Sequence, residues 1–238
     1  MADPLLKIEG LHADYGEVRV LWGIDAEVGA GEIVCIVGSN GAGKTTLLRT
    51  ISGLLPATSG RVQFMSEDIT QLGADQILAR GIAHVPEGRR LFRGLSVRDN
   101  LLLGAYLRRD ETEVRRDLDY VFSLFPVLRE RQGQDATTLS GGEQQMCAIA
   151  RGIMSRPMLL MIDELSLGLA PRLVERLSEA LIEINRAGMT ILLVEQDVMT
   201  AFEIAQHAFV IETGRVGLHG TAKSLAENPA IRQAYLGM

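Results

Sequence analysis

Residues 38–45, with the sequence GSNGAGKT, carry the strongest chemical signal in the chain. Gly38, Gly43, Lys44 and Thr45 have the spacing of a phosphate-binding loop, and they lie between an apolar run and a helical pattern, as this motif requires. In such a loop the backbone N–H groups surround the β-phosphate, the lysine reaches the β- and γ-phosphates, and the hydroxyl ligates Mg²⁺. The alternative is a glycine-rich turn without a ligand, but a chance match to four positions arises in only about one chain in a hundred. The motif therefore predicts a nucleoside triphosphate site.

Two carboxylates follow a second apolar run. Residues 158–162, MLLMI, read as a buried strand, and Asp163 and Glu164 come directly after it. Ligands bind at the carboxyl ends of the strands in parallel sheets, so both side chains are expected beside the phosphate loop. There Asp163 would join the shell of Mg²⁺, and Glu164 would polarise an attacking water. Taken alone, the pattern also fits a strand that runs into a polar turn, whereas the phosphate loop favours the catalytic interpretation.

A third segment, residues 137–145 with the sequence TTLSGGEQQ, begins a helical pattern. Ser140 and Glu143 have the spacing of a capping box, which explains both residues without a ligand. Gly141 and Gly142 would cost stability in a first helical turn, so another role should compensate. Helix N-termini bind anions through unpaired N–H groups, yet neither a lysine nor an apolar strand accompanies this segment. A helix cap and a phosphate contact are therefore both open at this point.

The composition describes an ordinary globular chain. Of 238 residues, 47% are hydrophobic and 23% are charged, and the formal net charge of -6 argues against non-specific nucleic-acid binding. Neither a signal peptide nor an apolar run of roughly 18 residues is evident. Cys35 and Cys147 read as small buried hydrophobes, and nothing indicates disulfides, so we expect a cytoplasmic protein.

The hydrophobic pattern predicts an α/β fold. Helical patterns separate several continuous apolar runs, which indicates a parallel sheet covered on both faces; the runs are IVCIVG, IAHV, MLLMI, TILLV and AFVIE. The early segments LLKIEGLHADYG and RVQFM alternate, which favours an added antiparallel β piece. Residues 88–156 look almost wholly helical. We therefore expect a single domain over 1–238, with a nucleotide-binding core at 1–87 and 157–238 and an inserted helical lobe at 88–156.

The segments GSNGAGKTT, LSGGEQQ and LLMIDE, in this order, resemble the nucleotide-binding subunit of ATP-binding cassette (ABC) transporters. The resemblance covers essentially the whole chain, and LSGGEQ is a highly specific signature. It implies a RecA-like P-loop NTPase core that binds ATP and Mg²⁺. It also implies that two cassettes pack head to tail, so that Ser140, Gly141, Gly142 and Glu143 of one close over ATP held by the other.

The resemblance also assigns roles to single residues. Tyr15 matches the aromatic residue that stacks on adenine, and Thr46 matches a contact to the α-phosphate. Lys44, Glu164 and Gln196 match the catalytic positions, and Thr45, Asp163 and Glu87 match the positions around the metal. The remaining loop contacts to the nucleotide are Gly38, Ser39, Asn40, Gly41, Ala42 and Gly43.

Several positions depart from the general family pattern. Glu87 stands where the family usually has glutamine, and Gln196 stands where it usually has histidine. Gln196 can donate a hydrogen bond to the γ-phosphate but cannot take up a proton. The segments PEGRRLF, VEQ and SLGLAP are similar to the LivF-type ATPases of branched-chain amino acid importers. Leu165 departs even from these, because a proline is expected after Glu164. The position of the usual histidine, here Gln196, is called the switch position, and Glu195 comes directly before it as in some importers.

The resemblance implies an energy-coupling ATPase at the cytoplasmic face of the inner membrane. Its expected partners are a second ATPase subunit, two transmembrane permease subunits and, indirectly, a solute-binding protein, but no nucleic acid. Branched-chain amino acids, amides and urea all remain open as cargo. The alternative is a non-transport ABC ATPase that acts on nucleic acid or the ribosome, although neither a long coiled coil nor a second cassette is present.

An arginine-rich segment follows Glu87. Its side chains form either a solvated surface or, with Leu91 and Phe92, part of a groove for a helix of the membrane subunit; the arginines are Arg89, Arg90, Arg93 and Arg98.

Overall fold

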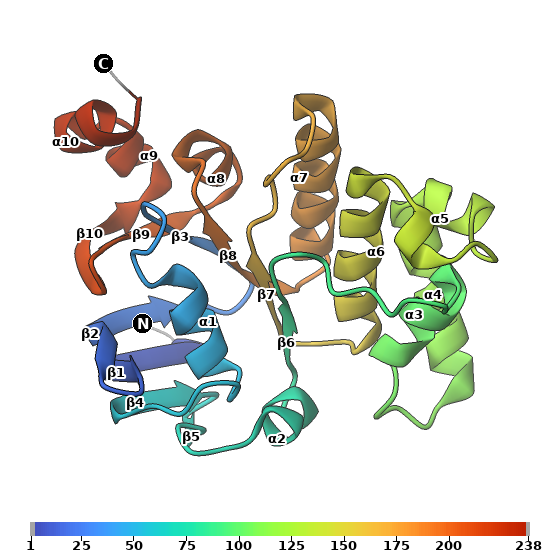
Figure 1. Cartoon of the computed structure of the whole chain (residues 1–238), viewed down its shortest axis with the longest axis horizontal. Helices are drawn as coiled ribbons and strands as arrows, with labels where there is room; N and C mark the ends of the chain where they lie inside the picture. The colour runs from blue at the N-terminus through green and yellow to red at the C-terminus, as the bar shows by residue number, and fades with distance from the viewer. Residues whose placement is uncertain (1–2, 237–238) are drawn as a thin grey trace.

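A computed structural model describes residues 3–236 of the chain. Within this range the strands form two sheets (Figure 1). The smaller sheet is antiparallel and has the order β2-β1-β4-β5, with β1 at Leu6–Tyr15, β2 at Val18–Val28, β4 at Ser59–Phe64 and β5 at Glu67–Asp68. The larger has the order β10-β9-β3-β8-β7-β6, with β3 at Ile33–Val37, β6 at Ile82–Val85, β7 at Leu159–Asp163, β8 at Thr190–Glu195, β9 at His207–Glu212 and β10 at Arg215–Thr221.

The larger sheet is parallel except for β10, which pairs antiparallel with β9. The helices of the α/β part are α1 at Lys44–Ile51, α2 at Ala74–Ala79, α7 at Pro171–Arg186, α8 at Val198–Ile204, α9 at Ala222–Ala226 and α10 at Pro229–Ile231, followed by a π-helical turn, η2, at Arg232–Leu236. The remaining helices gather at one end of the molecule, drawn in green and yellow in Figure 1. They are α3 at Val97–Gly104, α4 at Glu111–Leu124, α5 at Pro126–Glu130, the 3₁₀ turn η1 at Ala136–Thr138, and α6 at Gly141–Met154.

Strand β3 shows how the larger sheet is covered on both faces. Val34 and Ile36 belong to a core cluster shared with α1 and the smaller sheet. Cys35 and Val37 belong to a second cluster shared with α6, α7 and α8. Successive side chains of a strand point to opposite faces, so an unbroken apolar run is what a two-sided sheet requires. The predicted α/β fold with an antiparallel β piece and a helical lobe is confirmed.

The helical expectation for residues 88–156 is wrong at its start. The segment 86–96 forms turns and loops, and α3 begins at Val97. Gly88, Arg89 and Arg90 have φ values of 77°, 65° and 45°, which lie in the left-handed region and end any helical path. The domain boundaries themselves stay a prediction.

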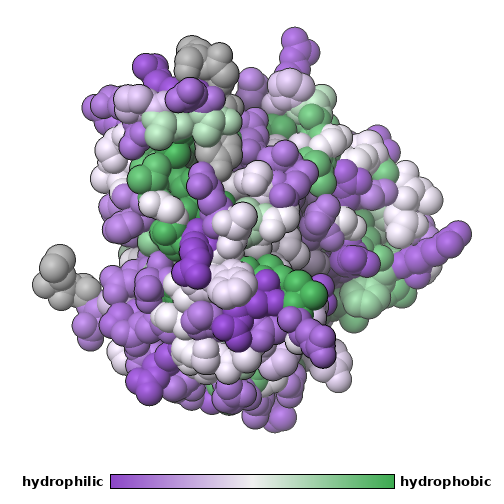
Figure 2. Space-filling model, turned by 60° about the vertical axis from the view of Figure 1, so that its left-hand side comes forward, coloured by the Kyte–Doolittle hydropathy of each residue, from purple (hydrophilic) through white to green (hydrophobic). Residues whose placement is uncertain are grey.

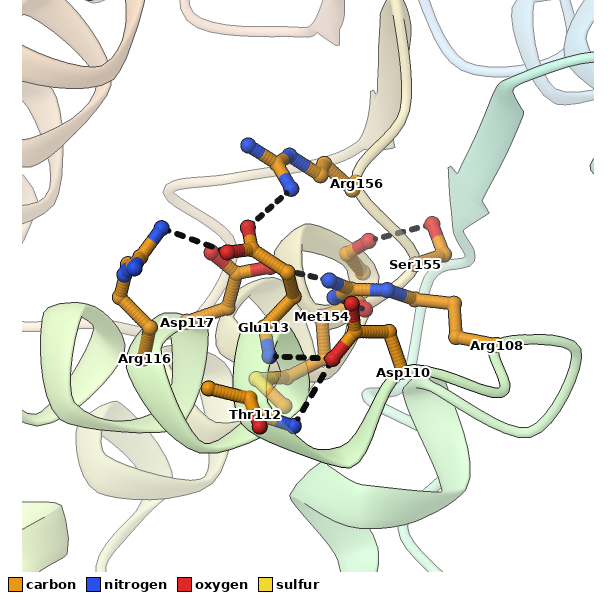
Figure 3. Close-up of polar contacts among 10 residues, drawn as sticks. Arg108, Asp110, Thr112, Glu113, Arg116, Asp117, Met154, Ser155 and Arg156 are labelled. Carbon is orange, nitrogen blue, oxygen red and sulfur yellow. Dashed lines mark hydrogen bonds and ion pairs between the residues drawn. The ribbon is translucent and has the colours of Figure 1, made fainter.

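A polar network ties the start of α4 to the end of α6 (Figure 3). Arg108 donates a hydrogen bond to the carbonyl of Met154 at 2.9 Å and pairs with Asp117 at 2.6 Å. Arg156, in the link from α6 to β7, donates to Glu113 at 2.8 Å. The point where the chain leaves the helical lobe for the sheet is therefore held by charged contacts.

The surface in view is mostly hydrophilic and is interrupted by separate hydrophobic patches (Figure 2). In the part of the chain that the structure describes, no helix combines the length and the apolar character needed to cross a membrane.

Close packing of α3 on α6 depends on Gly104. A Cβ atom at this position would lie 2.0 Å from the carbonyl oxygen of Arg151 and 2.9 Å from Cβ of Met154. A backbone atom cannot rotate away, so the two helices must separate to admit a methyl group.

We predict that Gly104→Ala lowers the free energy of unfolding by about 1–3 kcal/mol, as overpacking does in close-packed cores. Gly133→Ala is the matched control, because a Cβ there meets nothing within 4 Å among the described residues of the same lobe. The control should change stability by less than about 1 kcal/mol. Chemical denaturation of both variants measures the difference, and equal stabilities would contradict the packing argument.

Candidate functional site

The phosphate-binding loop joins β3 to α1. Gly41 and Gly43 adopt φ values of 79° and 106°, which glycine tolerates and other residues rarely do. A Cβ at Gly38 would lie 2.2 Å from the carbonyl oxygen of Ile211, so that position also requires glycine. Among the described residues no side chain caps α1 at Gly43. The backbone N–H groups at the start of α1 are therefore available to an anion.

The turn between β9 and β10 supports this loop. Gly214 donates its N–H to the carbonyl of Ala42 at 2.8 Å, and its own carbonyl accepts from the N–H of Trp22 at 2.8 Å. A Cβ on Gly214 would lie 1.9 Å from the carbonyl oxygen of Val20. Sequence reasoning missed Gly214, although the glycine of a tight hairpin turn is a recognisable signal.

A cavity of about 500 Å³ opens beside the loop. It is lined by Val20, Asn40, Gly41, Ala42, Gly43, Lys44, Thr45, Thr46, Glu87, Glu164, Leu167 and Gln196. Most of the residues expected to contact the phosphates therefore meet at one place, although they come from the ends of β3, β6, β7 and β8. Val20 and Leu167 were not expected there.

The side chain of Lys44 is buried in this cavity. Its Nζ donates to the carbonyls of Gly38 at 2.8 Å and Ser39 at 3.3 Å, and it lies 3.5 Å from Oε1 of Glu164. Glu164 has a φ of 58°, in the left-handed region, and its N–H donates to the carbonyl of Val194 at 2.9 Å. The lysine expected to reach the phosphates and the carboxylate expected to polarise the attacking water are thus in direct contact.

Asp163 provides a test of whether the site fits a divalent cation. Oδ1 of Asp163 accepts a hydrogen bond from Thr45 Oγ1 at 3.2 Å, whereas Oδ2 is buried without a hydrogen-bond partner among residues 3–236. Burial raises the pKa of this carboxyl to about 6, against the opposing effect of the bond from Thr45. A cation bound at Oδ2 would satisfy the orphaned oxygen and favour the ionised form.

The ligand set also suits magnesium. The described residues contain no group of three or more His, Cys, Asp and Glu side chains placed to hold a metal. Mg²⁺ is commonly held by one or two carboxylates together with substrate phosphates, so Asp163, Thr45 and Glu87 are sufficient. The residues present therefore fit this cation.

Tyr15 lies outside the cavity lining, at the turn between β1 and β2. Its side chain is exposed, and the guanidinium of Arg49 lies 5.8 Å from the centre of its ring. Its stacking on adenine stays a prediction.

The signature residues begin α6. Ser140 N–H donates to Oε2 of Glu143 at 2.9 Å, and the N–H of Glu143 donates to Oγ of Ser140 at 3.4 Å, so the expected capping box is confirmed. A Cβ at Gly142 would lie 2.5 Å from the end of the Leu173 side chain, and one at Gly141 would lie 3.2 Å from the guanidinium of Arg89. Both side-chain ends can move, so packing within the chain does not by itself require the two glycines.

Within the described chain, none of these four signature residues lines the cavity. In the view of Figure 1, β7 and α7 lie between α1 and α6. The structure thus gathers the phosphate loop and the strand-end residues but leaves the signature apart from them.

Arg89 and Arg90 are engaged with α6. Arg151 donates to the carbonyls of Arg90 at 2.8 Å and Arg89 at 3.1 Å, and Arg89 donates to Gln144 at 3.4 Å. The backbone of both residues and the side chain of Arg89 are therefore bound to the signature helix, whereas the side chain of Arg90 is exposed. A groove for a helix of the membrane subunit formed with Leu91 and Phe92 stays a prediction.

Comparison with known proteins identifies the family. The sequence profile of the ABC transporter family matches residues 21–166. The chain belongs to the ABC transporter family. It is 43% identical to the high-affinity branched-chain amino acid transport ATP-binding protein BraG of Pseudomonas aeruginosa, over 98% of this chain and 100% of that protein. It is 36% identical to the probable branched-chain amino acid transport ATP-binding protein LivF of Archaeoglobus fulgidus, over 98% and 99% of the two chains.

A solved ABC cassette has the same fold. The structure of MJ1267 in its ADP conformation superimposes with a TM-score of 0.86 at 25% identity and covers 100% of both chains. The ABC fold and the ATPase activity predicted from the three motifs are confirmed.

We predict that Asp163→Asn stabilises this ABC protein when nucleotide and metal are absent. Folding raises the pKa of Asp163 from near 3.8 to about 6, so the native state retains a proton that the unfolded state releases. The wild type therefore loses about 2–3 kcal/mol of stability from this group as pH rises from about 4 to about 6.

Asp163→Asn has no carboxyl group to ionise, so it does not lose this stability as the pH rises. Denaturation in EDTA should show Asp163→Asn more stable than wild type at pH 7, with the difference closing below pH 4. A constant difference across this pH range would contradict the assignment to Asp163.

Proposed function

We propose that the chain is the ATP-hydrolysing, energy-coupling subunit of an ABC importer for branched-chain or related amino acids. The observation that carries the proposal is the cavity that gathers Lys44, Thr45, Glu87, Glu164 and Gln196 at one edge of the sheet. The likeness to BraG and LivF, along nearly the whole chain, supports the importer and its cargo class.

In the proposed reaction a water attacks the γ-phosphorus of ATP, the bond to the β–γ bridging oxygen breaks, and ADP and phosphate leave. Glu164 orients the water and accepts its proton. Lys44 and the N–H groups of the loop stabilise the negative charge on the phosphates. Gln196 donates a hydrogen bond to the γ-phosphate but takes no part in proton transfer.

Thr45, Asp163 and Glu87 would hold Mg²⁺, with Oδ2 of Asp163 as the oxygen that lacks a partner in the described chain. When bound, the cation neutralises charge on the β- and γ-phosphates. Glu87 supplies a second carboxylate where the family usually has a neutral glutamine, so this site would hold its cation with more negative charge.

The nucleotide would extend from the loop to Tyr15, whose exposed ring offers a face for adenine. The loop contacts proposed for its phosphates are Gly38, Ser39, Asn40, Gly41, Ala42, Gly43 and Thr46. Arg49 beside the Tyr15 ring adds a positive charge on this side of the site.

A second ATPase subunit, identical or related, would complete the site. Ser140, Gly141, Gly142 and Glu143 lie outside the cavity of their own chain, which supports a contact with nucleotide held by a partner. Ser140 Oγ and the first N–H groups of α6 would then meet the γ-phosphate across a head-to-tail interface.

Two permease subunits are the proposed membrane partners, with the pair of ATPases at the cytoplasmic face of the membrane. A groove of about 340 Å³ between α2 and the ends of α3 and α6 suits a short helix, because several exposed apolar side chains line it. Its apolar residues include Leu78, Leu103, Tyr106, Leu107 and Met158, all of which are exposed. Three arginines also line the groove, each paired with a carboxylate: Arg80 with Glu67, Arg108 with Asp117 and Arg156 with Glu113.

A role on nucleic acid or the ribosome is less well supported. The formal net charge of -6 opposes binding to a polyanion, and the relatives named above are transport proteins.

We predict that Glu164→Gln lowers ATP turnover by roughly 10²-fold or more, the scale of a positioned base, while nucleotide binding is kept. Glu175→Gln, an exposed carboxylate on α7, is the matched control and should retain wild-type turnover. In cells that express the chain with its permease subunits, uptake of labelled leucine should fall together with turnover. Full hydrolysis by Glu164→Gln would exclude the proposed role of this residue. Leucine uptake that does not change with ATP turnover would exclude the proposal that this chain drives amino-acid import.

A second prediction separates the chain's own loop from the partner's signature. Lys44→Ala should weaken ATP binding to the isolated monomer by about 1.5–3 kcal/mol, the scale of a charged hydrogen bond. Ser140→Arg should leave monomer affinity unchanged yet block ATP-driven pairing, because its bulk occupies the place of the partner's γ-phosphate.

Nucleotide titration and light scattering measure the two effects. Ser140→Ala distinguishes loss of the helix cap, worth about 1 kcal/mol, from added bulk. If Ser140→Arg weakens monomer binding as much as Lys44→Ala does, the signature contacts nucleotide in its own chain and the head-to-tail proposal is wrong.

A further inference from the structure

The last residue of β8, Glu195, is a fully buried carboxylate that the proposed chemistry does not use. Its exposed fraction is 0%, and burial raises its pKa to about 7. A carboxylate removed from water costs free energy unless hydrogen bonds compensate it. Its contacts therefore indicate what it does at this position.

Glu195 binds two segments of the catalytic edge. Its Oε1 accepts from the N–H of Ser166 at 2.8 Å, and its Oε2 accepts from the hydroxyl of Ser166 at 3.0 Å and from the N–H of Gln196 at 3.2 Å. Ser166 follows Glu164 by two residues, and Gln196 is the switch-position residue. One carboxylate thus joins the loop after β7 to the loop after β8.

The loop after β7 needs such a support. Glu164 has a φ of 58°, a conformation that costs an ordinary residue free energy and persists only when its surroundings impose it. The residue that follows is Leu165, which lacks the fixed φ of the proline expected there. Leu165 is buried, the N–H of Glu164 is held by Val194, and the next hydrogen bonds along the loop are those from Ser166 to Glu195.

We propose that Glu195 is a positioning residue for hydrolysis, which holds Glu164 in its left-handed conformation through Ser166 and fixes the start of the Gln196 loop. This inference rests on the proposed role of Glu164. Glu195 touches neither nucleotide nor water in the proposed reaction, and it acts only through the two loops. The two bonds from Ser166 restrain the loop after β7, where a proline would instead fix the φ of residue 165.

The test compares Glu195→Gln and Ser166→Ala with wild type in ATPase kinetics and in ATP binding to the monomer. Glu195→Gln keeps the size of the side chain but places an NH₂ group against the Ser166 or Gln196 donors. It should lower kcat about tenfold or more, the scale of a displaced catalytic group, while ATP affinity changes less than about twofold. Ser166→Ala should lower kcat in the same direction, and the double variant should be no slower than Glu195→Gln alone.

The effect of Glu195→Gln is also measured in a protein that already carries Glu164→Gln. In single-turnover measurements, adding Glu195→Gln to Glu164→Gln should cause no further loss, because the residue to be positioned is already inactive. Glu212→Gln, an exposed carboxylate at the end of β9, is the matched control and should retain kcat.

The possible outcomes distinguish the proposed role of Glu164 in hydrolysis from the proposed positioning role of Glu195. Full hydrolysis by Glu164→Gln would overturn the proposed role of Glu164 itself. Loss of hydrolysis in Glu164→Gln, together with unchanged kcat in Ser166→Ala and Glu195→Gln, would overturn only the positioning role. Parallel losses of kcat, ATP affinity and melting temperature in Glu195→Gln, with no effect of Ser166→Ala, would show a purely structural carboxylate and would also overturn it. If Glu195→Gln does not fold, the kcat of Ser166→Ala decides.

Discussion

Three carboxylates and one lysine meet at the carboxyl ends of β7 and β8, and the surrounding structure accommodates this concentration of charge. Asp163 and Glu195 are almost fully buried, and Lys44 lies against Glu164. Burial raises the pKa of both Asp163 and Glu195, so each is ionised at a cost in stability. Hydrogen bonds from Thr45, Ser166 and Gln196 offset part of that cost, and one oxygen of Asp163 is left for a ligand.

Local sequence was enough to predict the phosphate loop, because its glycines, lysine and threonine are adjacent in the chain. The meeting of Thr45 with Asp163 was also predictable, although 118 residues separate them, since parallel strands end at the same sheet edge. The left-handed conformation of Glu164 was not predictable, because the residues that hold this loop, Val194 through the N–H of Glu164 and Glu195 through Ser166, come from another strand. The contact of Gly214 with the phosphate loop depends in the same way on a hairpin far along the chain.

The helix predicted from residue 88 onward does not form at the start of that segment, where contacts with another helix hold the backbone in a different conformation. Residues 88–90 take left-handed conformations, and Arg151 of α6 donates to the carbonyls of Arg89 and Arg90. Pro86, Gly88 and Gly94 are local signals against a helix here, whereas the contact with Arg151, about sixty positions later, cannot be predicted from the segment itself. The same contacts explain why the segment after Glu87 and the signature helix are joined in space: a shift of α6 would pull on the backbone two residues beyond Glu87.

The hydrogen bonds of Gly214 have a consequence for how the phosphate loop folds. The phosphate loop lies at residues 38–45, but its backbone is braced by a turn between two strands that follow much later in the sequence. Its flanking strand β3 likewise lies between β8 and β9, both of which are distant from it in the sequence. Chain segments fold as cooperative units once their contacts exist. A chain that lacks β8, β9 or the Gly214 turn would therefore lack the contacts that brace its ATP loop.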